Sequence, residues 1–338
     1  MPRISILIPC YNASHTLNEA IESMLNQTYT DFEIIAVDDG SEDDTKRILE
    51  NWAKRDNRIK VFAKEHSGII DSLNYGLKYC TAEYIARMDA DDRSHHERLA
   101  EQIAFLDDHP KIGLVSCLVK GFPQNHVREG FRVYINWLNS LVYNDEIQRD
   151  MYVESPLPHP SVVFRKQVML EVGGYQEHGW AEDYDLWLRM AQAGIQFAKV
   201  PRECLEWREH PERLTRKDSR YSLENFLRAK AYYLVKGPLS GKDAVILWGA
   251  GMMGRRLSKQ LRRQGAPIVA FVDIDPKKIG HTKHQLPIIS PDELIPWLNR
   301  YQRPILLAAV GARGARTLIR ERMNNLGFIE TVDWWSVA

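Results

Sequence analysis

Short apolar runs alternate with amphipathic segments through the first half of the chain. Apolar runs of this length are typical of buried strands, whereas apolar residues at every third or fourth position indicate one face of a helix. The strand-like runs lie at 4–8, 32–37, 59–62 and 84–88. The helix-like segments lie at 16–26, 43–52 and 69–79. This alternation predicts βαβ units and a mixed, mostly parallel sheet.

Polar residues follow three of these strand-like runs. Residues 9–12 read Pro-Cys-Tyr-Asn, residues 38–41 read Asp-Asp-Gly-Ser, and residues 89–92 read Asp-Ala-Asp-Asp. In parallel sheets, ligands bind beyond the carboxyl ends of the strands. The pattern therefore predicts a ligand site along one rim of the sheet.

The pattern loses its period between residues 120 and 160, where aromatic residues are frequent. A long segment of this kind is typically functional or irregular, and we expect an insertion of mixed helices and loops. Regular patterning returns with a strand-like run at 161–164 and a helix over 182–193.

A second strand-first pattern begins after a linker of turn residues at 236–241. A helix over 220–235 precedes this linker. We therefore expect two domains, at 1–236 and 242–338, and we expect the first to fold alone.

The second domain opens with a strand, a glycine-rich turn, a helix, and a strand that ends in an acid. In dinucleotide-binding units this order lets a pyrophosphate approach the helix N-terminus while the acid binds the ribose. The alternative is a retained fold used for packing, dimerisation or acceptor docking. The third strand of a full dinucleotide fold is hard to find, and no catalytic Tyr-x-x-x-Lys is evident, which argues against a dehydrogenase. The residues of this candidate second nucleotide site are Gly249, Gly251, Gly254 and Asp273.

Charge and cysteine content narrow the class of partner. The 338 residues include 45 Lys and Arg and 45 Asp and Glu, so bulk charge points neither to nucleic acid nor to an anionic membrane. The 4 cysteines form no CxxC pair, which is typical of reduced thiols in a cytosolic protein. No apolar stretch approaches transmembrane length. We expect a cytoplasmic protein, with peripheral membrane contact and homo-oligomerisation left open.

Three carboxylates, Asp89, Asp91 and Asp92, crowd the end of the run at 84–88. Carboxylates this close repel one another, and a hard divalent cation would offset the repulsion. Mg²⁺ typically binds one or two carboxylates together with a substrate phosphate, and Mn²⁺ favours the same oxygen ligands. The alternative is a polar turn that caps a helix beginning near Ser94.

Further short motifs recur along the first part of the chain. The series consists of Ser5-Ile-Leu-Ile-Pro-Cys-Tyr-Asn12, Val37-Asp-Asp-Gly-Ser41, Asn74-Tyr-Gly76, Met88-Asp-Ala-Asp-Asp92, Glu97-Arg-Leu99, His159-Pro-Ser161, Gly173-Gly-Tyr175 and Ala181-Glu-Asp-Tyr-Asp-Leu-Trp-Leu-Arg189. In this order, the series resembles the family 2 glycosyltransferases, which have the GT-A fold. The resemblance covers residues 1 to 215.

The resemblance implies a metal site and a donor site. Asp89 and Asp91 correspond to the DxD pair: Asp91 would hold the metal on the donor diphosphate, and Asp89 would contact the metal and the ribose or sugar. Asp92 would assist either. His210, in a segment that begins at Arg208, would reach the metal or the diphosphate, unless it is a solvated loop residue.

The resemblance also implies a nucleoside pocket and a catalytic base. Pro9, Tyr11 and Asp39 would line the pocket, with Asp39 accepting a hydrogen bond from the base. Asp183, beside Glu182, would take the proton from the acceptor hydroxyl. The alternative for both acids is a helix N-terminus, where the macrodipole favours negative charge.

One departure from the family concerns positive charge near the donor. Members often carry an arginine just before the asparagine that corresponds to Asn74, and Leu73 stands there. Arg87 or Lys64 could supply the charge, and the sequence leaves this open.

The second domain resembles small Rossmann-like domains attached to sugar-modifying enzymes. The resemblance lies at 246–254, 271–273, Gly280 and 286–294. We therefore expect a small Rossmann-like α/β domain after the GT-A domain.

The sequence as a whole predicts a metal-dependent, inverting glycosyltransferase of the hexosyltransferase type. The donor would be a nucleotide sugar, with a UDP-sugar favoured, and the cofactor Mn²⁺ or Mg²⁺. The acceptor would be a hydroxyl of a saccharide or a lipid-linked acceptor in polysaccharide or glycoconjugate biosynthesis. The alternatives are a bifunctional enzyme with a second nucleotide-binding or redox domain, and a non-catalytic protein that binds sugar nucleotides.

Overall fold

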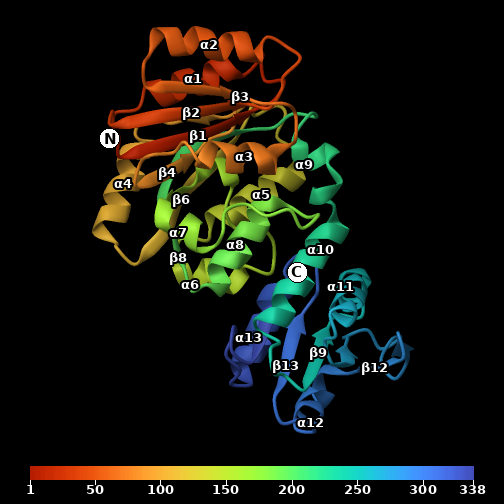
Figure 1. Ribbon diagram of the computed structural model, residues 1–338. Coiled ribbons are helices and arrows are strands. Elements are labelled where there is room, and N and C mark those ends of the chain that lie inside the picture. The colour runs from red at the N-terminus through yellow and green to blue at the C-terminus, as the bar shows by residue number, and fades with distance from the viewer. The chain divides into compact units, whose positions relative to one another are not determined.

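The computed structural model describes residues 1–338 and confirms the α/β class expected from the pattern. The chain forms two compact units, each with its own sheet (Figure 1). The first unit comprises 1–148, 156–178 and 182–217, and the second comprises 149–155, 179–181 and 218–338. None of the helices combines the length and the apolar character that a membrane span requires.

The first unit is built on an 8-stranded sheet in the order β3-β2-β1-β4-β7-β6-β8-β5. Its first four strands run parallel, as the alternation of strands and helices predicted. These strands are β1 (Ile4–Cys10), β2 (Phe32–Asp38), β3 (Ile59–Ala63) and β4 (Tyr84–Arg87). The helices between them are α1 (Leu17–Leu25), α2 (Thr45–Arg55) and α3 (Ile69–Leu77).

Alternate residues of β1 and β2 face two layers of helices. Ile6 and Ile8 belong to the core that also holds the apolar face of α1. On the opposite face, a Cβ on Gly76 of α3 would come within 2.3 Å of Leu7 and 2.9 Å of Val37. Figure 1 shows α1 and α2 on one side of these strands and α3 on the other. Because successive side chains of a strand point to opposite faces, β1 and β2 pack against helices on both sides of the sheet.

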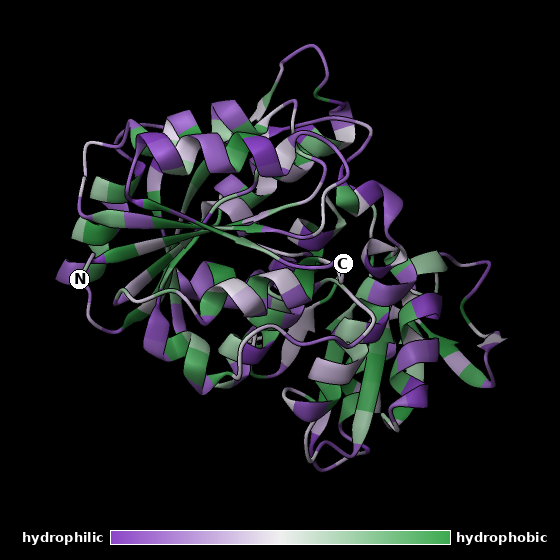
Figure 2. Ribbon diagram, turned by 45° about the horizontal axis from the view of Figure 1, so that its top comes forward, coloured by the Kyte–Doolittle hydropathy of each residue, from purple (hydrophilic) through white to green (hydrophobic).

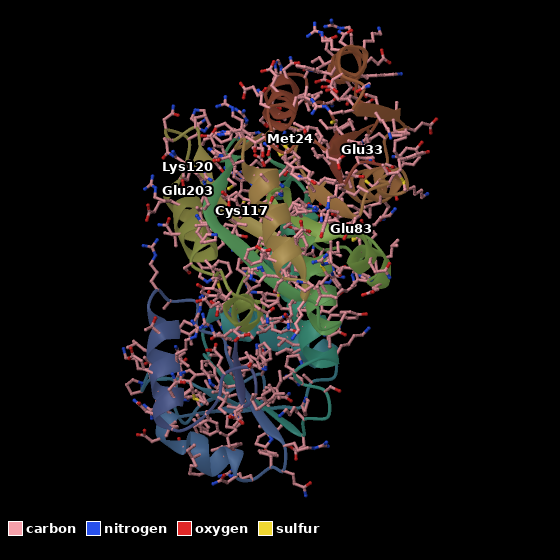
Figure 3. All side chains as sticks on the ribbon, turned by 90° about the vertical axis from the view of Figure 1, so that its left-hand side faces the viewer. Met24, Glu33, Glu83, Cys117, Lys120 and Glu203 are labelled. Atoms are coloured by element: carbon pink, nitrogen blue, oxygen red, sulfur yellow. The ribbon has the colours of Figure 1, made fainter.

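The other half of the sheet includes β7 (Val163–Arg165), which overlaps the strand-like run at 161–164, and two strands, β6 (Ile112–Phe122) and β8 (Gln196–Arg208), that the hydropathy pattern did not indicate. β7 lies antiparallel between β4 and β6, and β8 runs parallel to β6. Residues 201–203 of β8 are exposed, and its register with β6 shifts near Cys117. These irregularities interrupt the apolar period. Met24 and Cys117, labelled in Figure 3, both lie in the core of this unit.

The expected insertion of mixed helices and loops follows β6. It contains α5 (Glu129–Asn139) and α6 (Asn144–Asp150), and α8 (Glu182–Gln192) matches the helix expected over 182–193. α7 (Lys166–Glu171) follows β7.

The helix expected near Ser94 begins four residues later, as α4 (Arg98–Asp108). Arg93 and Ser94 instead form β5, which pairs with Glu206 and Leu205 of β8. The N-cap position of α4 is occupied by Glu97. The three aspartates at 89–92 therefore do not cap this helix, which removes the alternative interpretation of the cluster.

The second unit is built on a 6-stranded sheet in the order β11-β12-β10-β9-β13-β14. All of its strands run parallel except β11 at the edge. They are β9 (Ala244–Trp248), β10 (Ile268–Val272), β11 (Thr282–Lys283), β12 (Leu286–Ile289), β13 (Pro304–Ala308) and β14 (Trp334–Ser336). Its main helices are α10 (Leu223–Lys236), α11 (Met252–Arg263), α12 (Leu294–Leu298) and α13 (Ala315–Asn325). The third parallel strand, β12, escaped detection because it is short and follows a turn and β11 rather than a helix.

Residues 333–335 read Asp-Trp-Trp and resemble an exposed tail in the sequence, but the structure contradicts this. Trp334 is completely buried in the second core. β14 pairs with β13 in parallel, and strand alternation turns Trp334 inward. In Figure 2 the strands of both sheets are predominantly hydrophobic, while polar residues gather on the helices around them.

The compact units divide the chain before α10 rather than after it. α10 belongs to the second unit, as does the short segment 149–155. Within this unit, the buried Asp150 forms ion pairs with Arg316 and Arg320. Lys230 of α10 donates from Nζ to the carbonyl oxygen of Val153 at 2.6 Å. The expected division at 236–242 stays a prediction, and these contacts bear on whether residues 1–236 can fold alone.

Candidate active site

The three aspartates after β4 converge as the sequence predicted. One carboxylate oxygen from each of Asp89, Asp91 and Asp92 lies within 4.8 Å of the other two. Burial and the neighbouring carboxylates raise the pKa of Asp92 well above its ordinary value. Burial also raises the pKa of Asp89. The raised pKa values mean that ionising these carboxyls costs free energy. A cation among the three groups would lower that cost, so the cluster has the electrostatics of a divalent metal site.

The three carboxylates differ in their access to solvent. The side chains of Asp89 and Asp91 are 29% and 33% exposed, whereas Asp92 is 1% exposed. Asp92 accepts a hydrogen bond from the backbone N–H of Arg208 through Oδ1 at 2.7 Å, and its buried Oδ2 has no hydrogen-bond partner. Asp89 and Asp91 are therefore the pair that a bound ligand can reach, whereas Asp92 is the buried member of the cluster.

His210 lies beside this cluster, as the resemblance implied. Its Nε2 is 2.8 Å from Oδ2 of Asp91. This imidazole, although burial opposes it, keeps the pKa of Asp91 below its ordinary value. Carboxylate oxygens suit Mn²⁺ or Mg²⁺, so the aspartates of the cluster fit such a metal, and His210 lies within reach of it.

Arg208 fixes the segment that carries His210. Its Nε donates to the backbone carbonyl of Asp91, and its guanidinium pairs with Glu19 of α1. The same guanidinium lies over the ring of Phe122 at 4.4 Å. The end of β8 is thereby attached to the aspartate loop.

A buried arginine lies directly against the aspartate cluster. Arg87, the last residue of β4, is 2% exposed and pairs with Asp89. Its Nε has no hydrogen-bond partner. Burial alone would lower the pKa of Arg87, but Asp89 raises it. Leu73, at the position of the family's arginine, is buried in α3. Of the two substitutes that the sequence left open, Arg87 is the one that contacts the cluster.

Asp183 and Glu182 begin α8, where the sequence placed them. Burial first, and then the charge of Glu182, raise the pKa of Asp183 to about 8. Arg87 opposes this increase, so its charge acts on Asp89 and Asp183 alike. The pKa of the proposed base is thus shifted toward neutral pH, where general bases are most effective.

Sequence reasoning did not identify a polar chain behind these acids. Nε2 of His159 lies 2.7 Å from the hydroxyl of Tyr175, and its Nδ1 lies 3.8 Å from Glu182. Burial lowers the pKa of His159 well below its ordinary value, so the ring is neutral. Two residues of this polar chain belong to the sequence motifs at 159–161 and 173–175, but only folding brings these motifs together.

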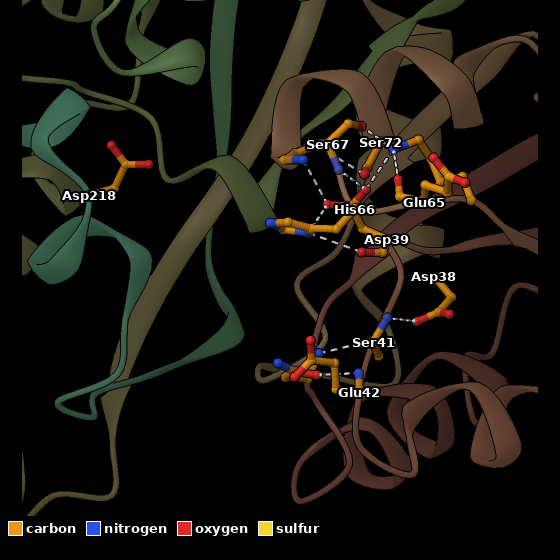
Figure 4. Close-up of polar contacts among 12 residues, drawn as sticks. Asp38, Asp39, Ser41, Glu42, Glu65, His66, Ser67, Ser72 and Asp218 are labelled. Atoms are coloured by element: carbon orange, nitrogen blue, oxygen red, sulfur yellow. Dashed lines mark hydrogen bonds and ion pairs between the residues drawn. The ribbon is translucent and has the colours of Figure 1, made fainter.

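The proposed nucleoside residues lie at the ends of β1 and β2. Pro9 pairs in register with Val37, and the N–H of Asp39 donates to the carbonyl of Cys10 at 2.9 Å. The Asp39 carboxylate is 3% exposed, and the loop at 64–68 encloses it (Figure 4). Lys64 pairs with it at 2.7 Å, so Lys64 neutralises Asp39.

The glycine-rich turn of the second unit needs two of its three glycines for steric reasons. Gly249 has φ +121°, and a Cβ on Gly254 would lie 1.8 Å from the carbonyl oxygen of Gly249. A Cβ on Gly251 would meet nothing within 4 Å. Asp273 accepts from the N–H of Ala250 at 3.1 Å and from Nζ of Lys278 at 3.0 Å. Asp273 therefore caps the turn itself.

Comparison with known proteins establishes the family. The model of glycosyl transferase family 2 matches residues 5–173. The amylovoran biosynthesis glycosyltransferase AmsE of Erwinia amylovora is 32% identical over 200 residues, which cover 58% of this chain and 73% of AmsE. The putative glycosyltransferase EpsE of Bacillus subtilis is 32% identical over 245 residues, which cover 71% of this chain and 85% of EpsE. The chain belongs to glycosyltransferase family 2, and it is a glycosyltransferase.

Solved structures share the fold. S. aureus TarS 1–349 in complex with UDP-GlcNAc has a TM-score of 0.57 at 20% identity, over 78% of this chain and 72% of that one. The mannosyltransferase PcManGT of Pyrobaculum calidifontis, in complex with GDP-Man and Mn²⁺, has a TM-score of 0.52 at 23% identity, over 71% of this chain and 65% of that one. At these identities the likeness concerns the fold, and it confirms the GT-A arrangement expected for the first unit.

Proposed function

We propose that this glycosyltransferase transfers a hexose from a nucleotide sugar to a hydroxyl acceptor with inversion, and that it depends on a divalent metal. The observation that carries the proposal is the convergence of Asp89, Asp91 and His210 at the end of β4. A non-catalytic binding protein would not need both an accessible carboxylate pair and a base whose pKa is raised to about 8.

Asp89, Asp91 and His210 would hold the metal. Mn²⁺ or Mg²⁺, when bound, supplies positive charge that stabilises the leaving nucleoside diphosphate. Arg87 adds a fixed positive charge next to Asp89 and opposes the rise that burial causes in the pKa of that carboxyl. Pro9, Tyr11 and Asp39 would hold the nucleoside.

Asp183 would act on the acceptor. In its ionised form, the carboxylate accepts the proton of the attacking hydroxyl, and the oxygen then attacks the anomeric carbon from the side opposite the diphosphate. Glu182 stays close enough to raise the pKa of Asp183, and the His159 ring, which faces Tyr175 through Nε2, lies 3.8 Å from Glu182 through Nδ1.

The donor and acceptor follow from chemistry and from relatives. We favour a UDP-sugar donor, because TarS was solved with UDP-GlcNAc, although PcManGT was solved with GDP-Man. The name of AmsE places that relative in amylovoran biosynthesis. A saccharide or lipid-linked acceptor in polysaccharide or glycoconjugate biosynthesis, a cytoplasmic location and homo-oligomerisation stay predictions for this chain.

The second unit offers two further roles. Its parallel strands follow the order of a dinucleotide-binding sheet, with β9 central and a glycine turn after it. A Rossmann-like nucleotide site at Gly249, Gly251 and Gly254 would make the enzyme bifunctional. We favour packing or acceptor docking, because Asp273 is already occupied by the turn and by Lys278.

Calorimetric titration with UDP and GDP, with and without Mn²⁺, tests the main proposal. We expect tight binding of one nucleotide only when the metal is present. Asp91→Asn should abolish the effect of the metal, whereas Asp92→Asn, at a buried supporting position, should weaken it much less. Equal affinity with and without metal would remove the metal from the mechanism.

A further inference from the structure

His66 adopts the position of a ligand on two residues of the proposed nucleoside pocket. Its ring stacks on the ring of Tyr11, with centroids 4.1 Å apart and planes at 24°. Its Nδ1 lies 2.9 Å from Oδ2 of Asp39 and 3.0 Å from the backbone carbonyl of Asp39 (Figure 4). An aromatic ring that stacks on Tyr11 and faces Asp39 with a ring nitrogen reproduces both contacts expected of a nucleobase.

The direction of this hydrogen bond follows from its partners. Both oxygens of Asp39 that face Nδ1 of His66 are acceptors, since an ionised carboxylate and a carbonyl have no proton to give. Lys64, and the N–H groups of Ser67 and Gly68, keep the pKa of Asp39 low although burial opposes them. Nδ1 of His66 therefore carries the proton and donates it, as the N–H of a pyrimidine or purine base would.

His66 also covers the Asp39 carboxylate. The carboxylate accepts from Nζ of Lys64 at 2.7 Å, from N of Ser67 at 3.1 Å and from N of Gly68 at 2.8 Å. The Ser72 side chain also bonds to this carboxylate, and the His66 ring lies against its Oδ2 at 2.9 Å. A nucleobase that stacks on Tyr11 and approaches Oδ2 of Asp39 therefore meets the imidazole.

The donor that can leave is the imidazole. The side chain of His66 is 52% exposed, whereas that of Lys64 is 17% exposed. The backbone of the loop is held: a Cβ on Gly40 would lie 2.7 Å from N of His66, and N of Lys64 donates to the carbonyl of Asp38 at 3.0 Å. Only rotation of the His66 side chain frees Tyr11 and Asp39 without moving the loop.

We propose that the His66 imidazole is an internal competitor of the donor nucleobase, occupying its place on Tyr11 and Asp39 until the nucleotide displaces it. The inference rests on the nucleoside pocket proposed above. A chain whose pocket is closed for part of the time binds its ligand with an affinity reduced by that fraction. The device sets the concentration of nucleotide sugar at which the pocket opens.

Titration of UDP in the presence of Mn²⁺ into the full chain and its variants tests the proposal. His66→Ala removes both the stack and the hydrogen bond, and we expect the Kd for UDP to fall by roughly three- to tenfold. His66→Phe keeps the stack and loses the hydrogen bond, so its Kd should lie between those of His66→Ala and the native chain. His126→Ala, at an exposed histidine, is the matched control and should leave Kd unchanged.

Two further variants separate the failure of this inference from failure of the pocket. Tyr11→Ala and Asp39→Asn should both raise the Kd for UDP. If they do, and His66→Ala leaves Kd unchanged or raises it, His66 is a wall of the pocket and the competitor role is wrong. If neither of them weakens binding, the pocket itself is misplaced and the inference falls with it. Melting temperatures of all variants exclude loss of fold.

The ring itself provides a direct readout. Nuclear magnetic resonance of the imidazole nitrogens should show the signals of His66 moving on addition of UDP, as the ring leaves Tyr11 and Asp39. The signals of His126 should stay in place. A His66 signal that stays in place while UDP binds would contradict displacement.

Discussion

At the residue scale, the raised pKa of Asp183 limits the pH range in which this group can act as a base. Because burial and Glu182 raise this pKa to about 8, the carboxyl is largely protonated at lower pH and cannot accept a proton. We expect the transfer rate at saturating donor to rise with pH up to about 8. Asp183→Asn should lower turnover by about 10²–10⁴-fold and leave the Kd for UDP nearly unchanged. Near-normal transfer in this variant would move the role of base to Glu182.

The raised pKa of Asp183 predicts that stability depends on pH in the direction opposite to the transfer rate. Between the ordinary aspartate pKa of 3.8 and about 8, the folded chain binds the proton of Asp183 and the unfolded chain does not. The contribution of Asp183 to stability therefore falls as pH rises through this window. Asp183→Asn should melt higher than the native chain, with a difference that grows from pH 5 to pH 8. Asp145→Asn, at an exposed acid in the first turn of α6, should show no such trend.

Arg87 links the metal cluster to the base. Its charge lowers the pKa of Asp183, so Arg87→Met should raise that pKa further and move the pH dependence of transfer to higher pH. Arg87→Lys keeps a charge and should shift the profile less. Initial rates across the pH range measure the shift. An unchanged profile in Arg87→Met would show that the two sites are electrostatically separate.

At the element scale, substitutions in the glycine turn between β9 and α11 distinguish a steric requirement for glycine from a role in ligand binding. Gly254→Ala places a Cβ 1.8 Å from the carbonyl oxygen of Gly249, so we expect a loss of stability of about 1–3 kcal/mol or more. Gly251→Ala meets no atom and should melt like the native chain. Denaturant unfolding followed by tryptophan fluorescence compares the two.

The matched variant Gly251→Val then tests for a second nucleotide site. A bulky side chain there should block approach of a pyrophosphate to the start of α11. If the native chain binds two equivalents of nucleotide and Gly251→Val binds one, the preference for a packing role is wrong. If both bind one equivalent, the second unit has no nucleotide site of this kind.

At the scale of the whole molecule, the two compact units do not follow the linker at 236–241. A chain truncated after Lys236 keeps the buried Asp150 but loses its partners Arg316 and Arg320. Arg149 still pairs with Asp150 in the truncated chain, but removal of partners from a buried ion pair costs about 3–5 kcal/mol. Contrary to the expectation from sequence, we therefore predict that residues 1–236 aggregate or melt well below the full chain.

The control for this prediction replaces the charge. Asp150→Asn in the truncated chain should restore part of the lost solubility, whereas the same change in the full chain should destabilise it by removing the ion pairs of Asp150 with Arg316 and Arg320. A truncated chain that is soluble and melts like the full chain would restore the domain division at 236–242.

The features that the sequence by itself determined are those that depend on residues close together along the chain. Apolar periods located β1, β2 and β4, because each strand is buried over consecutive residues. Ligand-binding rims follow strand ends, so the positions of Asp39 and of the aspartates at 89–92 could be predicted from the same periods. The role of Asp183 came from a resemblance and not from any period.

Only the tertiary structure decided how these residues are paired. β8 was hidden by its exposed residues, and the sheet partner of β14 lies far from it along the chain. Arg87 is in the sequence only one of two candidates for a missing positive charge, and His66 looks ordinary there. Their contacts with Asp89 and Asp39 depend on hydrogen bonds and ion pairs between segments that folding brings together. Local pattern specifies where a strand ends, and long-range packing specifies which charges meet there.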